Sequence, residues 1–240
     1  MPRPMPKSKL KPALFFDFDN TLTTGDVLDE IIEKFSPNEA WRDWENAWAA
    51  GHLPARDCLR NQIENMRVSR ASLLDYLTGV RIDPVFAEIV DWAKPRRIEI
   101  NIVSDSFLPL IGHVLLSNGI EGVPVFANDL RFLGTDRLVP SFPFHDPACE
   151  RSANAKASHL APYRFNRTVF AGDGHSDLDA ALAADIVFAK STLARELDAR
   201  AIPYWPFDTL DPVLAYLETA EAAEGTWQTS VAHDDGRAGR

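Results

Sequence analysis

The sequence predicts an α/β protein whose core is a Rossmann-like, mainly parallel sheet with an inserted four-helix cap. Two observations carry this prediction. Short, nearly continuous apolar runs alternate with helical patterns along most of the chain, and one long stretch, residues 25–82, contains helical patterns only. Continuous apolar runs are typical of parallel strands covered on both faces, and their alternation with helices favours a parallel sheet.

Five apolar runs are the expected strands of the core. They are Ala13–Asp17, Ile98–Val103, Val123–Phe126, Thr168–Ala171 and Ile186–Ala189. Apolar stretches on either side of Gly134-Thr135-Asp136 predict a β-hairpin over Leu130–Phe144. The first core helix has Asp83 at a position suited to an N-cap and Pro84 at the first helical position, where proline is favoured. The expected core helices are Pro84–Lys94, Phe107–Ser117, Asn154–Leu160, Ser176–Ala183 and Thr192–Ala199.

Residues 25–82 are expected to form four short helices, because turn-forming residues interrupt the helical pattern three times. The predicted helices lie near residues 26–35, 38–50, 55–66 and 70–77. The chain therefore divides into a discontinuous core, residues 1–24 and 83–222, and a helical cap, residues 25–82. Residues 223–240 are polar and rich in small side chains, and we expect them to be a disordered tail.

Charge and composition exclude several classes of protein. The chain has 240 residues, of which 35 are Asp or Glu and 25 are Lys or Arg, so its formal net charge is −10. This charge argues against nucleic-acid and membrane-surface partners. Two cysteines cannot form a disulfide framework, and no apolar run approaches the roughly 20 residues that a membrane span needs. We expect a cytoplasmic protein, and nothing in the sequence indicates its oligomeric state.

Asp17 and Asp19 follow the first predicted strand. Because side chains of a strand alternate in direction, both carboxylates are expected on one side at its carboxyl end. Crowding two carboxylates is unfavourable without a cation between them, and open α/β sheets bind ligands at this edge. Hard oxygen ligands suit Mg²⁺. The alternative is a loop with two solvated aspartates.

Three further patterns supply the remaining parts of a phosphate site. Asp173 lies between two glycines after a later strand, so it can give a third carboxylate to the same cation, and Asp177 lies one helical turn further on. Ser104 follows another strand and offers a hydroxyl with backbone N–H groups at the start of a helix. Lys156, on a predicted helix, can place a positive charge on a phosphate. Each residue alone has an ordinary structural explanation, whereas their occurrence together favours an active site.

These residues resemble the four motifs of the haloacid-dehalogenase superfamily of phosphatases: DFDNT at residues 17–21, Ser104, Lys156, and GDGHSD at residues 172–177. The helical insertion after the first motif is similar to the cap of the phosphoserine-phosphatase-like branch, subfamily IB. Within that branch the motifs resemble two groups, the phosphoethanolamine/phosphocholine phosphatases and the methylthiopentenyl-phosphate phosphatases of methionine salvage. One departure is Asp105-Ser106 after Ser104, where phosphoserine phosphatases usually have two glycines. It disfavours phosphoserine as the substrate.

The resemblance implies a phosphoric monoester hydrolase that acts on a small phosphorylated metabolite through an aspartyl-phosphate. Asp17 would be the nucleophile. Asp19 would protonate the leaving alcohol and then accept a proton from the attacking water. Asp177 would orient Lys156 or a metal-bound water.

The same resemblance implies Mg²⁺ as the cofactor. Asp17, Asp173 and the backbone carbonyl of Asp19 would hold the ion, which neutralises phosphoryl oxygens. Ser104 and Lys156 would bind the other oxygens of the phosphate.

The cap offers candidate substrate contacts. Asp26 lies where phosphoserine phosphatases carry an acidic residue that binds the substrate amine, and it is equally suited to be a helix N-cap. Arg60, on another predicted cap helix, could reach the substrate or belong to a solvated face. Three tryptophans with helical spacing could form an aromatic wall, although packing in the core is the favoured interpretation. They are Trp41, Trp44 and Trp48.

Two alternative functions stay open at this point. One is carbon–halogen hydrolysis on the same scaffold, as in haloacid dehalogenases. The acid Asp19 counts against it, because a halide leaves without a proton. The other is a non-catalytic binding protein with the same fold, which the complete set of motif residues disfavours.

Overall fold

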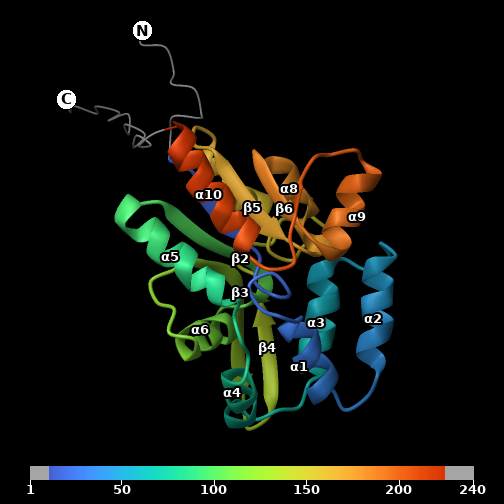
Figure 1. Cartoon of the computed structure of the whole chain (residues 1–240). Coiled ribbons are helices and arrows are strands. Elements are labelled where there is room, and N and C mark those ends of the chain that lie inside the picture. The colour runs from blue at the N-terminus through green and yellow to red at the C-terminus, as the bar shows by residue number, and fades with distance from the viewer. Residues whose placement is uncertain (1–10, 225–240) are drawn as a thin grey trace, which may run out of the picture.

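The computed structural model describes residues 11–224 (Figure 1). The first ten residues of the predicted core and residues 225–240 of the predicted tail lie outside the described residues. Residues 223 and 224, which we assigned to the tail, belong to the last helix. No helix in the described part of the chain is both long and apolar enough to cross a membrane.

Within residues 11–224, seven strands form one sheet in the order β4-β3-β2-β1-β5-β6-β7. All neighbouring strands are parallel except β3 and β4, which form the predicted hairpin. The predicted α/β, Rossmann-like fold class is confirmed. The strands are β1 (Ala13–Phe16), β2 (Glu99–Phe107), β3 (Val125–Leu133), β4 (Arg137–Ser141), β5 (Thr168–Gly172), β6 (Ile186–Ala189) and β7 (Trp205–Pro206).

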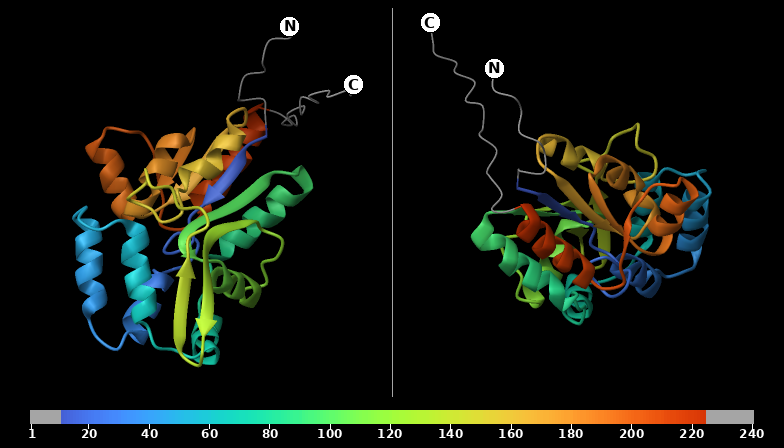
Figure 2. Two further views of the ribbon diagram at one scale, coloured as in Figure 1. Left: turned by 180° about the vertical axis from the view of Figure 1, so that it is seen from behind. Right: turned by 45° about the horizontal axis from the view of Figure 1, so that its top comes forward.

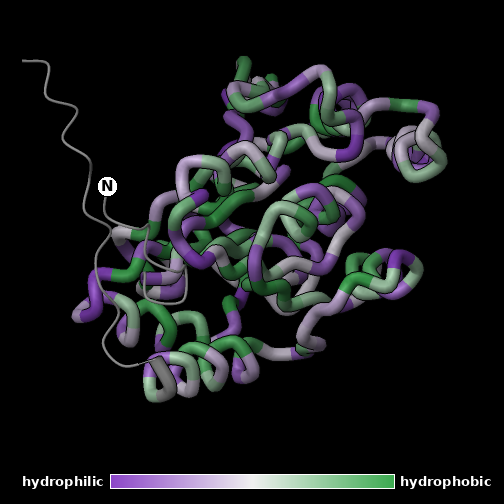
Figure 3. The backbone as a smooth tube through the Cα atoms, turned by 90° about the horizontal axis from the view of Figure 1, so that it is seen from above, coloured by the Kyte–Doolittle hydropathy of each residue, from purple (hydrophilic) through white to green (hydrophobic). Residues whose placement is uncertain are grey.

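Helices cover both faces of the sheet, so its central strand is buried on both sides. Leu14 and Phe16 of β1 pack in one apolar cluster with α5, α6 and α10, whereas Ala13 and Phe15 pack in a second cluster with α7, α8 and α9. The hydrophobic segments concentrate in the interior of the molecule (Figure 3). The core helices are α5 (Pro84–Arg96), α6 (Leu108–Ser117), α7 (Ala157–Leu160), α8 (Leu178–Ala183), α9 (Ser191–Ala199) and α10 (Asp211–Glu224).

Two elements that carry site residues differ from the prediction. β2 continues to Phe107, with a register shift against β3 after Val103, so Ser104 lies inside the strand and α6 begins only at Leu108. The expected helix from Asn154 is also wrong, because α7 begins at Ala157 and Lys156 precedes it. The Asn154 side chain instead donates to backbone carbonyls of β2 and β3. Such side-chain bonds compete with helix formation.

The predicted four-helix insertion is present between β1 and α5. It consists of α1 (Val27–Phe35), α2 (Ala40–Ala49), α3 (Ala55–Asn65) and α4 (Arg70–Thr78). Its apolar faces belong to the same buried cluster as the sheet: Ile31, Ile63 and Leu73 are members together with Phe16 and Ile111. The cap therefore shares one apolar core with the sheet.

The β3–β4 hairpin lies beside the cap helices (Figure 2). The backbone N–H of Val68, between α3 and α4, donates to the carbonyl of Asp136 in the hairpin turn at 2.9 Å. The guanidinium of Arg60 on α3 lies over the ring of Phe142, just after β4, at 5.4 Å. The hairpin thus contacts both α3 and the segment that joins α3 to α4.

Candidate active site

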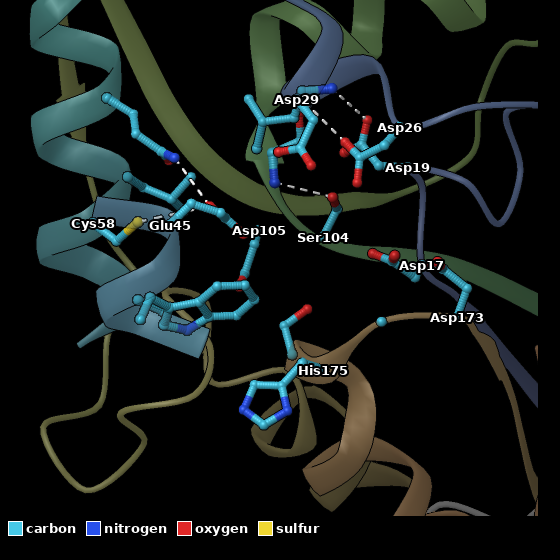
Figure 4. A pocket seen from close by; sticks show the side chains of 18 of the residues that line it. Asp17, Asp19, Asp26, Asp29, Glu45, Cys58, Ser104, Asp105, Asp173 and His175 are labelled. Atoms are coloured by element: carbon cyan, nitrogen blue, oxygen red, sulfur yellow. Dashed lines mark hydrogen bonds between the residues drawn. The ribbon is translucent and has the colours of Figure 1, made fainter. Parts of the chain in front are cut away.

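The motif residues meet in one pocket between the carboxyl ends of β1, β2 and β5 and the cap helices α1, α2 and α3 (Figure 4). The cavity volume is about 130 Å³, which is small beside the roughly 300–1,000 Å³ of drug-sized ligand pockets. It is lined by Asp17, Asp19, Asp26, Leu28, Asp29, Glu45, Trp48, Ala55, Cys58, Leu59, Gln62, Ser104, Asp105, Ser106, Lys156, Asp173, Gly174, His175 and Ser176.

Lys156 is buried at the bottom of the pocket with all three ammonium donors in use. Its Nζ lies 2.8 Å from Asp17 Oδ1, 2.6 Å from Asp177 Oδ1 and 3.1 Å from Ser176 Oγ. Burial by itself lowers the pKa of Lys156, but the carboxylates of Asp17 and Asp177 outweigh burial and raise that pKa well above its usual value. Lys156 therefore keeps its positive charge beside the Asp17 carboxylate.

Three carboxylates crowd together beside Lys156. One oxygen each of Asp17, Asp173 and Asp177 lie within 4.8 Å of one another. Burial raises the pKa of Asp17 well above its usual value, and the neighbouring Asp177 carboxylate raises it further, whereas Lys156 lowers it. Burial and Asp177 also raise the pKa of Asp173 to about 6. This hard-oxygen donor set fits a divalent cation, which would relieve the repulsion.

Asp177, at the end of the 3₁₀ turn His175–Asp177, holds the loop that carries Asp173. Its Oδ2 accepts hydrogen bonds from the backbone N–H groups of Asp173 at 3.0 Å and Gly174 at 2.9 Å. A Cβ on Gly172 would lie 2.8 Å from the same oxygen, which explains the glycine. With both oxygens engaged, Asp177 is placed to orient Lys156 and Asp173.

Asp19 is buried against the first turn of α1. Its Oδ1 accepts a hydrogen bond from the backbone N–H of Leu28 at 3.1 Å. Burial raises the pKa of Asp19 well above its usual value, and the nearby Asp26 carboxylate adds to the increase, while the Leu28 N–H opposes it. The surroundings of Asp19 therefore disfavour its ionised form.

Asp26 is the N-cap of α1, and its predicted contact with the substrate stays a prediction. Its Oδ1 accepts a hydrogen bond from the backbone N–H of Asp29 at 2.9 Å, so it caps α1, and it also lines the pocket.

Ser104 is buried and lines the pocket, and its Oγ accepts a hydrogen bond from the Ser106 N–H at 3.0 Å. The helix N-terminus expected at Ser104 is absent, because β2 continues past it.

The cap side of the pocket carries an acidic wall, formed by Asp26, Asp29 and Glu45. Gln62 Nε2 holds Glu45 Oε2 at 3.0 Å. Burial raises the pKa of Asp29 to about 8, and repulsion from the Asp26 and Glu45 carboxylates contributes to the increase. Sequence reasoning missed Asp29, Glu45 and Gln62. They lie on three different helices, so no spacing in the sequence indicated that they share one pocket.

Arg60 does not reach the pocket. Its guanidinium pairs with Asp57 at 3.1 Å, and it is absent from the described residues that line the cavity. The packing interpretation holds for Trp41, which packs against the core, but is wrong for Trp48. Trp48 lines the pocket and donates a hydrogen bond from Nε1 to the Arg151 carbonyl at 3.1 Å. Its ring also makes an edge contact with the ring of His175. His175 lines the pocket as well, and sequence reasoning missed it.

Comparison with known proteins agrees with this geometry. The family model for haloacid dehalogenase-like hydrolases matches residues 14–182. A 2-hydroxy-3-keto-5-methylthiopentenyl-1-phosphate phosphatase of Brevibacillus brevis is 26% identical over 217 residues, which cover 88% of this chain and 97% of that protein. The polyol phosphate phosphatase of Saccharomyces cerevisiae is 26% identical over 241 residues, covering 90% and 97%. A solved phosphoserine phosphatase, described as a phospho-aspartyl intermediate analogue, superposes with a TM-score of 0.65 at 19% identity, covering 87% and 99%.

Proposed function

Because this chain belongs to the haloacid dehalogenase-like hydrolase family, we propose that it hydrolyses a small phosphorylated metabolite through a phosphoaspartate on Asp17. The observation that carries the proposal is the buried contact of Lys156 with Asp17 and Asp177, next to the protonatable Asp19. A buried cation beside a carboxylate nucleophile suits a substrate that brings its own negative charge. The relatives named above, which are phosphatases, support the same class of reaction.

The proposed reaction has two steps. In the first, an Asp17 oxygen attacks phosphorus, the ester P–O bond breaks, and the leaving alcohol takes its proton from Asp19. In the second, water attacks phosphorus, gives its proton to Asp19, and releases inorganic phosphate with the Asp17 carboxylate restored. Lys156 and the Ser104 hydroxyl would hold the phosphoryl oxygens in both steps.

Mg²⁺ is the cofactor that we propose for this site. Asp17, Asp173 and the backbone carbonyl of Asp19 would hold the ion, with Asp177 fixing the Asp173 loop. When bound, the ion supplies positive charge to the phosphoryl oxygens and lowers the repulsion between nucleophile and substrate. The buried Asp19 carboxyl group in the pocket supports phosphomonoester hydrolysis over carbon–halogen hydrolysis, since only the alcohol leaving group needs a proton.

We also propose that residues 25–82 act as a specificity cap over a core of residues 1–24 and 83–222. The acidic wall faces the leaving group, and Lys156 is the only Lys or Arg among the described residues that line the pocket. Two opposed unit charges about 4 Å apart interact by about 4 kcal/mol at an effective dielectric of 20, and like charges repel equally. The wall therefore favours a small alcohol that is neutral or cationic and rejects one that carries a carboxylate.

A substrate panel tests both the activity and this preference. With Mg²⁺ present, the protein is expected to release phosphate from p-nitrophenyl phosphate and from small esters of neutral or cationic alcohols, such as glycerol phosphate and phosphocholine. We expect kcat/KM for these esters to exceed that for phosphoserine and 3-phosphoglycerate by at least about tenfold, equivalent to about 1.4 kcal/mol.

Glu45→Gln is the matched variant, because it removes one of the three carboxylates of the wall and retains the shape of the side chain. It should narrow the difference in kcat/KM between substrates with cationic and with anionic leaving groups. The rate with p-nitrophenyl phosphate should stay nearly unchanged. A wild-type preference for carboxylated substrates would contradict the proposed specificity. Failure to hydrolyse any phosphomonoester in the presence of Mg²⁺ would contradict the proposed activity.

The pKa of Asp29 gives the specificity a pH dependence. Below its pKa of about 8 the Asp29 side chain is protonated and neutral, and above it the side chain is negative. The ratio of kcat/KM for phosphocholine to that for glycerol phosphate should therefore rise several-fold between about pH 7 and about pH 9. The quaternary ammonium of choline does not titrate, and the ratio cancels ionisations that affect both substrates. Asp29→Asn should make the ratio independent of pH, so a persisting rise in that variant would rule out Asp29 as its source.

A further inference from the structure

Asp105 is a pocket carboxylate that the proposed chemistry does not use. It lies in β2 next to Ser104, and three donors from one turn bind it. Oδ1 accepts from Ser152 Oγ at 2.6 Å and from the Asn154 N–H at 3.0 Å, and Oδ2 accepts from the Ala153 N–H at 3.1 Å. A carboxylate has about four acceptor positions, so the turn occupies most of its capacity.

The turn that Asp105 binds leads directly to Lys156. Asn154 Nδ2 adds two further bonds, to the carbonyls of Ser104 and Phe126, both at 2.6 Å. Ala155 then has a φ of +40°, a left-handed conformation in which a residue with a Cβ is strained. Such a backbone conformation is unfavourable and persists only where its surroundings fix it. The sequence places no glycine here, so the fixing falls to the hydrogen bonds of the turn.

The position of Lys156 depends on this turn, because α7 has only four residues and begins after it. The Lys156 ammonium lies within 2.8 Å of both Asp17 Oδ1 and Asp177 Oδ1. The backbone of Lys156 precedes α7, so no helix or strand fixes its position. A shift of the turn by about 1 Å would lengthen both contacts beyond a strong charge-assisted hydrogen bond. The Asp105 carboxylate accepts hydrogen bonds from three consecutive residues, 152–154.

We propose that Asp105 is a positioning residue: it fixes the turn of residues 152–155 and thereby holds the Lys156 ammonium against Asp17. This inference rests on the proposed function only for its effect on catalysis, since the anchoring of the turn is a property of the fold. It differs from a substrate-binding role for Asp105, which would change the ranking of leaving groups. A positioning role lowers activity toward all phosphomonoesters alike.

Asp105→Asn is the informative substitution because it keeps the shape of the side chain. The amide retains one acceptor oxygen and directs an NH₂ group either at the Ala153 N–H or at the donors on the other side. One donor of the turn then faces another donor, which is unfavourable in a partly buried site. Ser152→Ala is the milder comparison, since it removes one of the three donors and leaves the carboxylate intact.

The test is a double-mutant cycle on the full chain with Asp105→Asn, Lys156→Met and the double variant. For Asp105→Asn we expect a fall in kcat/KM of about tenfold to 100-fold with p-nitrophenyl phosphate, and weaker inhibition by orthovanadate. In the Lys156→Met background the same substitution should change kcat/KM by less than about twofold, because the group that it positions is gone. The ranking of phosphocholine, glycerol phosphate and phosphoserine should stay unchanged.

Two measurements keep the outcome independent of activity. Amide hydrogen exchange of a peptide spanning residues 150–158, and acetylation of the Lys156 amine by a small reagent, should both be faster in Asp105→Asn and, to a smaller degree, in Ser152→Ala. Unchanged exchange and labelling, additive effects in the cycle, or an altered substrate ranking would each overturn the inference. If the wild-type protein hydrolyses no phosphomonoester while exchange and labelling increase as expected, the proposed function fails and the anchoring stands. Should Asp105→Asn not fold, Ser152→Ala decides through the same two measurements.

Discussion

Asp17→Asn is expected to abolish turnover and to form no covalent phosphoenzyme, whereas Asp19→Asn is expected to accumulate one. An amide cannot attack phosphorus, so no step proceeds in the first variant. In the second, Asp17 and Lys156 are retained, and p-nitrophenolate leaves without much help from a proton. Hydrolysis of the intermediate still needs the base, and general acid–base catalysis is typically worth about 10²–10⁴-fold. Slowing only the second step makes the phosphoaspartate accumulate.

Mass spectrometry after acid quench checks this expectation. The peptide that contains Asp17 should gain about 80 Da in Asp19→Asn after brief exposure to p-nitrophenyl phosphate, since acyl phosphates survive acid. The matched control is the Asp17→Asn/Asp19→Asn double variant, which should show no increment. An increment on Ser104, or turnover in Asp17→Asn above the level of the buffer, would contradict the assignment of the nucleophile.

Removal of divalent metal is expected to lower the rate of turnover by at least about 10³-fold. Seven acidic residues and one lysine are among the described residues that line the pocket. A phosphate dianion that enters the pocket without a metal ion therefore meets strong repulsion. A Lewis-acidic ion contributes several kcal/mol to such a step, and each 1.36 kcal/mol is a tenfold change in rate. EDTA should remove the activity, and Mg²⁺ should restore it. Ca²⁺ should support less turnover, because its larger and looser coordination sphere misplaces the attacking oxygen.

Asp173→Asn tests which residues hold the ion. Loss of one charged ligand should raise the Mg²⁺ concentration needed for half-maximal activity, with a smaller change in the rate at saturating Mg²⁺. A rise in the midpoint of thermal unfolding with added Mg²⁺, reduced in Asp173→Asn, gives a readout that does not depend on turnover. Full activity of the wild-type protein in chelated buffer would contradict the metal requirement.

Asp17 and Asp173 were predictable from sequence because the position of each depends on the end of one strand. Asp17 and Asp173 follow β1 and β5, and adjacent parallel strands bring their carboxyl ends together regardless of the rest of the chain. Long apolar runs and the proline at the start of α5 fixed most core elements in the same local way. The four cap helices were predictable because their apolar faces recur with helical spacing.

The remaining parts depend on contacts that no local pattern encodes. Asp29 and Glu45 face one cavity only because the tertiary fold brings α1 and α2 to the same pocket. The helix expected from Asn154 gives way to a turn because side-chain bonds to β2 and β3 outweigh local helix propensity. β7 has two residues, Trp205 and Pro206, which is too short for a periodic signal.

The apolar cluster shared by cap and sheet determines how this protein can acquire new specificities. If the cap were a module joined by a hinge, recombination could exchange it for another cap. Here deletion of residues 25–82 would remove Ile31, Ile63 and Leu73 from the apolar cluster that they share with the core, and exposed apolar patches promote aggregation. Cap and core are therefore expected to unfold in one cooperative transition and to be inherited together. Evolution and engineering alike would reach new leaving groups through single exchanges in the acidic wall, at Asp29 and Glu45, rather than by grafting.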